Sequence, residues 1–134
     1  MASKALCSED EISRLVHAFY ARVRKDEVLG PFFDRHISDW DGHLVKLVDF
    51  WSSMLLRTGR FSGAPMPKHV VLPGLTAELF QHWLVLFRET AAAQPNQAMA
   101  GQAVVMAERI ARSLWMGYQM SRHPDAPPAT LVHG

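Results

Sequence analysis

Apolar residues recur along this chain at the three- and four-residue spacing of amphipathic helices, and the alternation typical of β-strands is absent. Ser8 and Glu11 have the spacing of a helix capping box, so a first helix should begin just after Ser8. We expect this helix to end near Lys25. Its apolar face comprises Ile12, Leu15, Val16, Phe19, Tyr20 and Val23.

Two further helical segments are predicted next along the chain. Pro31 suits the first position of a short helix that carries Phe32 and Phe33. Ser38 or Asp39 can cap a longer helix over residues 40–57. The inner face of the longer helix follows helical spacing and comprises His43, Leu47, Phe50, Trp51, Met54 and Leu55.

The stretch that follows is irregular and contains the most distinctive histidine of the chain. Residues 58–67 hold two glycines and two prolines, which favour a loop. His69 lies between Pro67 and Pro73, and these prolines permit only about one helical turn between them. An irregular connection of about 18 residues is uncommon in a compact domain and is usually functional. We therefore treat His69 as a candidate functional residue.

Two long helices complete the predicted fold. Thr76 can cap a helix of about 15 residues, and a last helix is expected over residues 97–121. The apolar side of the first of these comprises Leu79, Phe80, Trp83, Phe87 and Thr90. The pattern predicts an all-α fold in one domain over residues 1–134, with loose termini at 1–8 and 122–134.

Composition excludes several kinds of partner and site. The 134 residues carry 14 basic and 13 acidic side chains, and this balance gives no reason to expect nucleic acid as a partner. Cys7 is the only cysteine, so neither an internal disulfide nor a cysteine metal cluster can form. Membrane partners are not expected, because no apolar run approaches the roughly 18 residues of a span. The N-terminus lacks the apolar core of a signal peptide, so we expect a cytoplasmic protein.

The two histidines His43 and His69 allow more than one interpretation. A histidine on an apolar helix face is often a hydrogen-bonded core residue, and Trp83 can equally be a core aromatic. A protein-only metal site is not favoured, because two imidazoles are too few ligands and no HExxH pair is present. Two such histidines can instead flank haem, which needs one axial nitrogen and an apolar slot. Candidates for lining that slot are Leu47, Phe50, Trp51, Leu72, Leu79 and Phe87.

Four segments, in order, resemble the truncated haemoglobins, and most closely their third group. They are FYARVRKDEVLGPFF (19–33), DWDGHLVKLVDFWSSMLL (39–56), PMPKHVVLP (65–73) and LFQHWLVLF (79–87). The chain lacks the Gly-Gly corner motifs that the first two groups usually carry, and this absence is typical of the third. The resemblance implies a globin-like, two-over-two helical sandwich around haem b, iron protoporphyrin IX.

The resemblance also assigns roles to individual residues. His69 matches the proximal iron ligand, and His43 matches the distal-helix position that faces the gas ligand. Tyr20 matches the tyrosine whose hydroxyl donates to that ligand, and Trp83 matches the tryptophan whose indole N–H does the same. Phe33 matches the aromatic residue at the haem edge. On this interpretation His43 is a further donor, a gate to solvent or a sixth iron ligand.

Further residues are expected to line the haem or to contact its propionates. Helical spacing from His43 puts Leu47 one turn and Trp51 two turns further along, so both are expected to face the cofactor. Leu72 is expected to line the haem slot. Candidates for contacts to the haem propionates, from their position around the loop alone, are Arg57, Arg60 and Lys68.

The resemblance implies a haem protein that binds O2, CO or NO through His69. Several polar donors fit redox chemistry of O2, NO or peroxide better than bulk O2 delivery, since delivery requires easy release. Two alternatives stay open. One is a haem enzyme, a peroxidase or NO dioxygenase, that needs a separate reductase. The other is a cofactor-free all-α interaction domain. We expect a monomer or a weak dimer.

Overall fold

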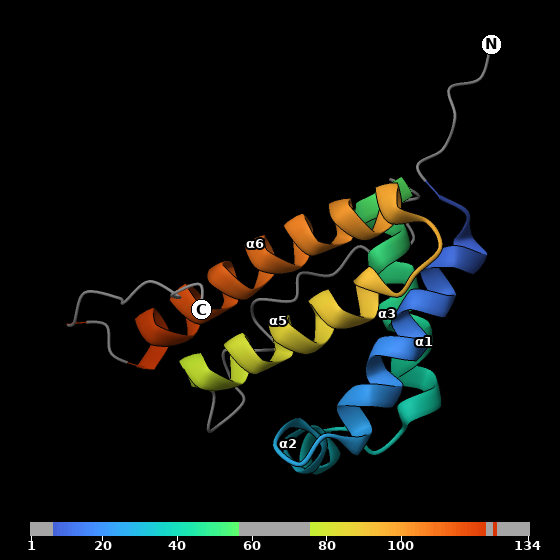
Figure 1. Ribbon diagram of the computed structural model, residues 1–134. Coiled ribbons are helices and arrows are strands. Elements are labelled where there is room, and N and C mark those ends of the chain that lie inside the picture. Colours follow the sequence, from blue (N-terminus) through green and yellow to red (C-terminus); the bar gives the residue numbers. More distant parts are fainter. Residues whose placement is uncertain (1–6, 57–75, 123–124, 126–134) are drawn as a thin grey trace.

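The computed structural model describes residues 7–56, 76–122 and 125 (Figure 1). Within these residues the regular elements are α-helices, which confirms the predicted all-α class. None of the helices described is both long and apolar enough to cross a membrane. The helices are α1 (Glu9–Lys25), α2 (Leu29–His36), α3 (Trp40–Leu56), α5 (Ala77–Ala92) and α6 (Gln97–Arg122).

Four of the helices form two antiparallel pairs that cross each other. Helices α5 and α6 run side by side as one pair, and α1 and α3 form the other (Figure 1). The pairs meet where α1 contacts α5 and where α3 contacts α6. The short helix α2 lies at the C-terminal end of α1 and also contacts α5. The described helices therefore have the predicted two-over-two arrangement.

Side-chain caps explain where several of the helices begin. The Ser8 hydroxyl oxygen accepts the N–H of Glu11 at 3.1 Å, and the Glu11 carboxylate accepts the N–H of Ser8 at 2.8 Å. The Thr76 hydroxyl oxygen accepts an N–H three residues further on at 3.1 Å, at the start of α5. At the start of α3 the Asp39 carboxylate does the same at 3.1 Å. The predicted caps at Ser8, Thr76 and Asp39 are confirmed.

The start of α2 differs from the prediction. The sequence pattern placed Pro31 at the first helical position, but α2 begins two residues earlier, at Leu29. The reason is a cap from further upstream: Asp26 Oδ1 accepts the backbone N–H groups of Val28 and Leu29, each at 2.9 Å. These bonds satisfy donors that a helix start leaves open, so the turn of helix can form before the proline.

The core combines aromatic packing on one side of α5 with small side chains on the other. Where α5 meets α1, the buried residues include Phe19 and Phe87. Helix α6 contributes side chains that recur every three or four residues, and small groups at such positions let two helices pack closely. The buried residues of α6 are Met99, Ala100, Ala103, Ala107, Ala111 and Leu114.

Candidate functional site

A buried tyrosine and a tryptophan meet where α1 faces α5. Tyr20 is 5% exposed, and its hydroxyl oxygen accepts the indole N–H of Trp83. Burial raises the pKa of Tyr20 to about 12, and the hydrogen bond from Trp83 acts in the opposite direction. The hydroxyl therefore keeps its proton at neutral pH. Since its oxygen already accepts one N–H, that proton can be donated to a further acceptor.

Aromatic packing around Phe19 holds this pair in place. The Phe19 ring centroid lies 4.7 Å from that of Tyr20, 5.3 Å from Trp83 and 5.0 Å from Phe87, each in an edge-to-face arrangement. Such contacts stabilise beyond the burial of their area. The sequence produces this cluster because Phe19 and Tyr20 are adjacent on the broad apolar face of α1, while Trp83 and Phe87 lie one turn apart on α5.

Helix α3 has two apolar faces that differ in burial. Trp51, Ser52 and Leu55 are buried. The second face is a row one or two turns apart, formed by His43, Leu47, Phe50 and Met54, and each of these is only half-buried. The neighbouring helices cover the first face and leave this apolar row partly uncovered. We name this set the α3 row.

The α3 row suits a flat apolar group that also meets polar donors, and haem is such a group. Leu47 and Phe50 offer apolar contact, His43 offers an imidazole, and a buried neutral hydroxyl is held at Tyr20. No group of three or more His, Cys, Asp or Glu side chains in the described residues could hold a metal ion alone. The imidazole, the neutral hydroxyl and the apolar contacts of the described residues fit the needs of haem.

Trp40 is a site residue that the sequence reasoning did not single out. Its ring centroid lies 6.2 Å from that of Tyr20 and 6.0 Å from the imidazole of His43, which it meets edge to face. The Trp40 indole N–H donates to Asp34 Oδ1 at 3.1 Å, and the Arg24 guanidinium lies 4.8 Å from its ring centroid. The signal available in the sequence was its position three residues before His43, which puts both on one face of α3.

Two other predicted residues have clear positions. Phe33 is half-buried on α2, and its ring centroid lies 6.2 Å from that of Tyr20, so these two predicted site residues come together. Trp51 is 3% exposed and stacks on Phe87 at 5.2 Å, and Phe87 in turn stacks on Trp83 at 5.5 Å. The contact of Trp51 with a cofactor stays a prediction.

The proximal side of the predicted site lies outside the described residues. This applies to the predicted iron ligand His69 and to Leu72. It applies also to the candidate propionate partners Arg57, Arg60 and Lys68. The structure thus brings together Tyr20, Phe33, His43 and Trp83 through direct contacts or through Trp40 and Phe19.

Comparison with known proteins gives one curated relative and one solved structure. No protein-family model matches the chain. The chain is 37% identical over 108 residues to the group 3 truncated hemoglobin ctb of Campylobacter jejuni, covering 78% of this chain and 85% of the relative. The structure of this chain is similar to the crystal structure of the group III truncated hemoglobin from Campylobacter jejuni. The TM-score is 0.78 and the identity 32%, over 95% of this chain and all of the other.

Proposed function

The chain belongs to the group III truncated haemoglobins, and on that premise we propose that it binds haem b and takes a diatomic gas, O2, CO or NO, at the haem iron. The observation that carries the proposal is the buried Tyr20–Trp83 hydrogen bond. It places a neutral hydroxyl donor in an otherwise aromatic environment, which Trp40 connects to His43 of the partly uncovered α3 row.

Each side of the haem is assigned to different residues. When bound, haem supplies an iron with one coordination position for a gas ligand. His69 is the proposed proximal ligand, and Leu72 is proposed to line the slot beside it. On the other side, the proposed lining is Phe33 and the α3 row, with Tyr20 as the direct polar donor and Trp83 as the residue that donates to Tyr20.

Tyr20 is proposed to act as the direct donor to the gas ligand. Its hydroxyl keeps its proton because burial raises its pKa, and the N–H of Trp83 polarises the same hydroxyl. Hydrogen bonds in such a chain strengthen one another. A donor facing a ligand atom with partial negative charge is worth about 1–3 kcal/mol in a dry site, so the pair should slow O2 dissociation. Slow release favours redox chemistry of O2, NO or peroxide over O2 delivery.

His43 is proposed to act at the solvent side of the site. It is half-buried, whereas Tyr20 is 5% exposed, and its imidazole packs on the edge of Trp40. From this position it can donate to a gas ligand or control its entry.

Absorption spectroscopy of the purified protein tests the proposal. We expect a Soret band, with or without added haem, that shifts when the ferrous protein takes up CO. His69→Ala should strip or weaken haem binding. The matched control is His17→Ala, because His17 is an exposed histidine of α1 that bonds Ser13, and it should leave the spectrum unchanged.

Two results would contradict the proposal. Protein with no Soret band even after haem addition would exclude haem binding. Full haem retention by His69→Ala, with an unchanged spectrum, would exclude His69 as the iron ligand and leave the haem proposal standing.

A further inference from the structure

Asp26 joins three helices at one point. Its N–H donates to the carbonyl of Val23 at the end of α1. Its Oδ1 atom accepts the N–H groups of Val28 and Leu29, which begin α2. Its Oδ2 atom lies 2.7 Å from Nε2 of His82 on α5, a distance at which the imidazole donates to the carboxylate. This one residue thus forms hydrogen bonds with α1, α2 and α5.

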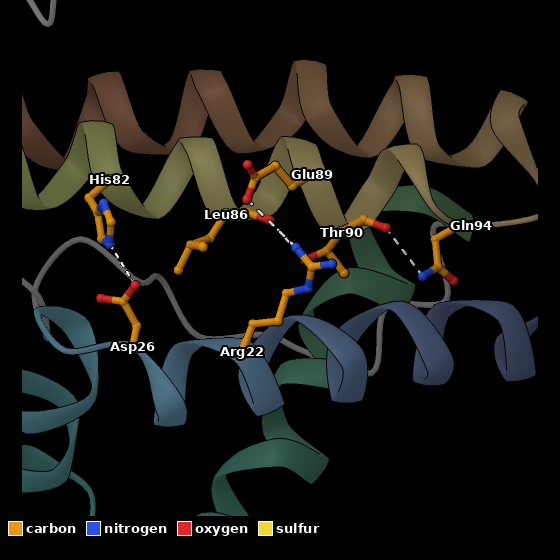
Figure 2. A network of polar contacts seen from close by, with 7 residues as sticks. All are labelled: Arg22, Asp26, His82, Leu86, Glu89, Thr90 and Gln94. Carbon is orange, nitrogen blue, oxygen red and sulfur yellow. Dashed lines mark hydrogen bonds and ion pairs between the residues drawn. The ribbon is translucent and has the colours of Figure 1, made fainter.

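This contact lies close to the Tyr20–Trp83 hydrogen bond. His82 immediately precedes Trp83 on α5, and Asp26 follows Tyr20 by six residues, at the C-terminal end of α1. At a rise of about 1.5 Å per residue, six residues span roughly 9 Å along a helix axis. Figure 2 shows Asp26 and His82 pointing toward each other across the α1–α5 contact.

A second ion pair bridges the same two helices and provides a comparison. Arg22 and Glu89 lie 3.6 Å apart, with side chains 48% and 58% exposed (Figure 2). Pairs of this kind contribute little, because they are solvated and mobile. The Asp26 side chain is 15% exposed and its partner His82 is 37% exposed, and Asp26 is also held by two backbone N–H groups. The Asp26–His82 contact is therefore the more rigid of the two.

Asp26 is charged at neutral pH. Burial raises the pKa of its carboxyl group, but hydrogen bonds from the Leu29 N–H, His82 and the Val28 N–H outweigh burial, and the net effect lowers the pKa. A carboxylate with these partners accepts from His82 in a charge-assisted bond, and such bonds are shorter and stronger than neutral ones.

We infer that Asp26 and His82 are positioning residues, which hold α5 in the rotation at which the Trp83 indole N–H donates to the Tyr20 hydroxyl. A hydrogen bond prefers an angle above about 150° at its hydrogen and weakens steeply below about 120°, so a rotation of α5 that turns the indole N–H away from the hydroxyl weakens this bond. The part of the inference that concerns gas binding rests on the proposed function. The part that concerns the Tyr20–Trp83 hydrogen bond does not depend on it.

The first test reads the hydrogen bond directly, by the NMR resonance of the Trp83 indole N–H in protein as purified. The resonance is assigned with Trp83→Phe. We expect His82→Ala to move the resonance upfield, as loss of an acceptor does. In His82→Gln and in Asp26→Asn the resonance should stay close to its wild-type position, because each of these variants can keep a hydrogen bond between residues 26 and 82. Glu89→Ala, which removes the Arg22 pair between the same helices, should leave the resonance in place.

The second test reads the consequence for gas binding, by the O2 dissociation rate of the haem-loaded protein. His82→Ala should speed dissociation about three- to tenfold, the range for loss of one neutral hydrogen bond. In a Trp83→Phe background it should add nothing, because His82 acts only through Trp83. Glu89→Ala should change neither rate.

The inference is overturned if His82→Ala leaves the indole resonance where it is while circular dichroism shows a folded protein. It is also overturned if His82→Ala speeds dissociation as much in the Trp83→Phe background as in the wild type. Should Asp26→Ala fail to fold, Asp26→Asn and His82→Ala still decide the question. The indole resonance requires no bound gas, so failure of the gas-binding proposal and failure of this inference give different results.

Discussion

Trp83 and Trp115 are both half-buried at contacts of α5, but their indole N–H groups differ. The indole N–H of Trp83 donates to Tyr20 where α5 meets α1. Trp115 belongs to α6, and its ring centroid lies 5.8 Å from that of Phe80 on α5 and 5.9 Å from that of Tyr118. The indole N–H of Trp115 is buried without a hydrogen-bond partner among the described residues.

The difference distinguishes a tryptophan that only packs from one whose N–H also takes part in a hydrogen bond. A buried N–H without an acceptor costs about 1–3 kcal/mol, so Trp115 is held in place by its ring contacts despite its polar group. At Trp83 the chain supplies an acceptor, and that acceptor is a buried hydroxyl with a proton of its own to donate. The α5–α6 contact is closed by small side chains such as Ala103 and Ala107. The α5–α6 contact also holds an ion pair between Arg88 and Glu108 at 2.7 Å, but the α1–α5 contact is where an indole N–H meets a buried hydroxyl.

The largest expected effect comes from raising the pH until Tyr20 would ionise. Its pKa is about 12 in the folded protein, against about 10 in the unfolded chain. The unfolded state therefore loses this proton first, and the free energy of unfolding should fall as pH rises from 10 to 12. The contribution is fully present below pH 10, and two pKa units correspond to about 3 kcal/mol.

Denaturant titration at pH 9, 10 and 11.5 measures this loss, with Tyr20→Phe as the control because it removes the ionisable group. The difference in stability between wild type and Tyr20→Phe should shift against the wild type as pH rises. A difference that does not change with pH would mean that Tyr20 is not buried as a neutral hydroxyl.

A smaller effect on the free energy of unfolding is expected from replacing each of the two tryptophans. Trp115→Phe and Trp83→Phe remove the same atoms, so the loss of ring volume is similar, but among the described residues only Trp83 has a hydrogen bond to lose. We expect Trp83→Phe to reduce the free energy of unfolding by about 1 kcal/mol more than Trp115→Phe does. Urea unfolding of both variants measures the difference. An equal or larger loss in Trp115→Phe would show that the Trp115 N–H has an acceptor after all.

The elements could be predicted from the sequence because their signals are local. The capping box at Ser8 and the cap at Thr76 act within three residues, and apolar spacing identified the inner face of α1. The predicted start of α2 was wrong, because the side chain of Asp26, and not the ring of Pro31, decides where the helix begins. That cap is also local, and the spacing from Asp26 to Leu29 was a usable signal.

The contacts of the site were harder to predict from the sequence, because they join residues that are far apart in the chain. The contact between Trp40 and Tyr20 depends on how α3 packs beside α1. The contact between Asp26 and His82 spans 56 residues and depends on the crossing of α1 and α5. The family resemblance supplied Tyr20 and Trp83 as two donors to one ligand, but it did not indicate that one would donate to the other.

The most direct test of this account is the O2 dissociation rate in a cycle of Tyr20→Phe, Trp83→Phe and the double variant. If Tyr20 donates to the gas ligand and Trp83 acts through Tyr20, Tyr20→Phe should speed dissociation about ten- to hundredfold and Trp83→Phe about three- to tenfold. The double variant should then match Tyr20→Phe alone. Unchanged rates in both single variants, or effects that multiply in the double variant, would contradict the account.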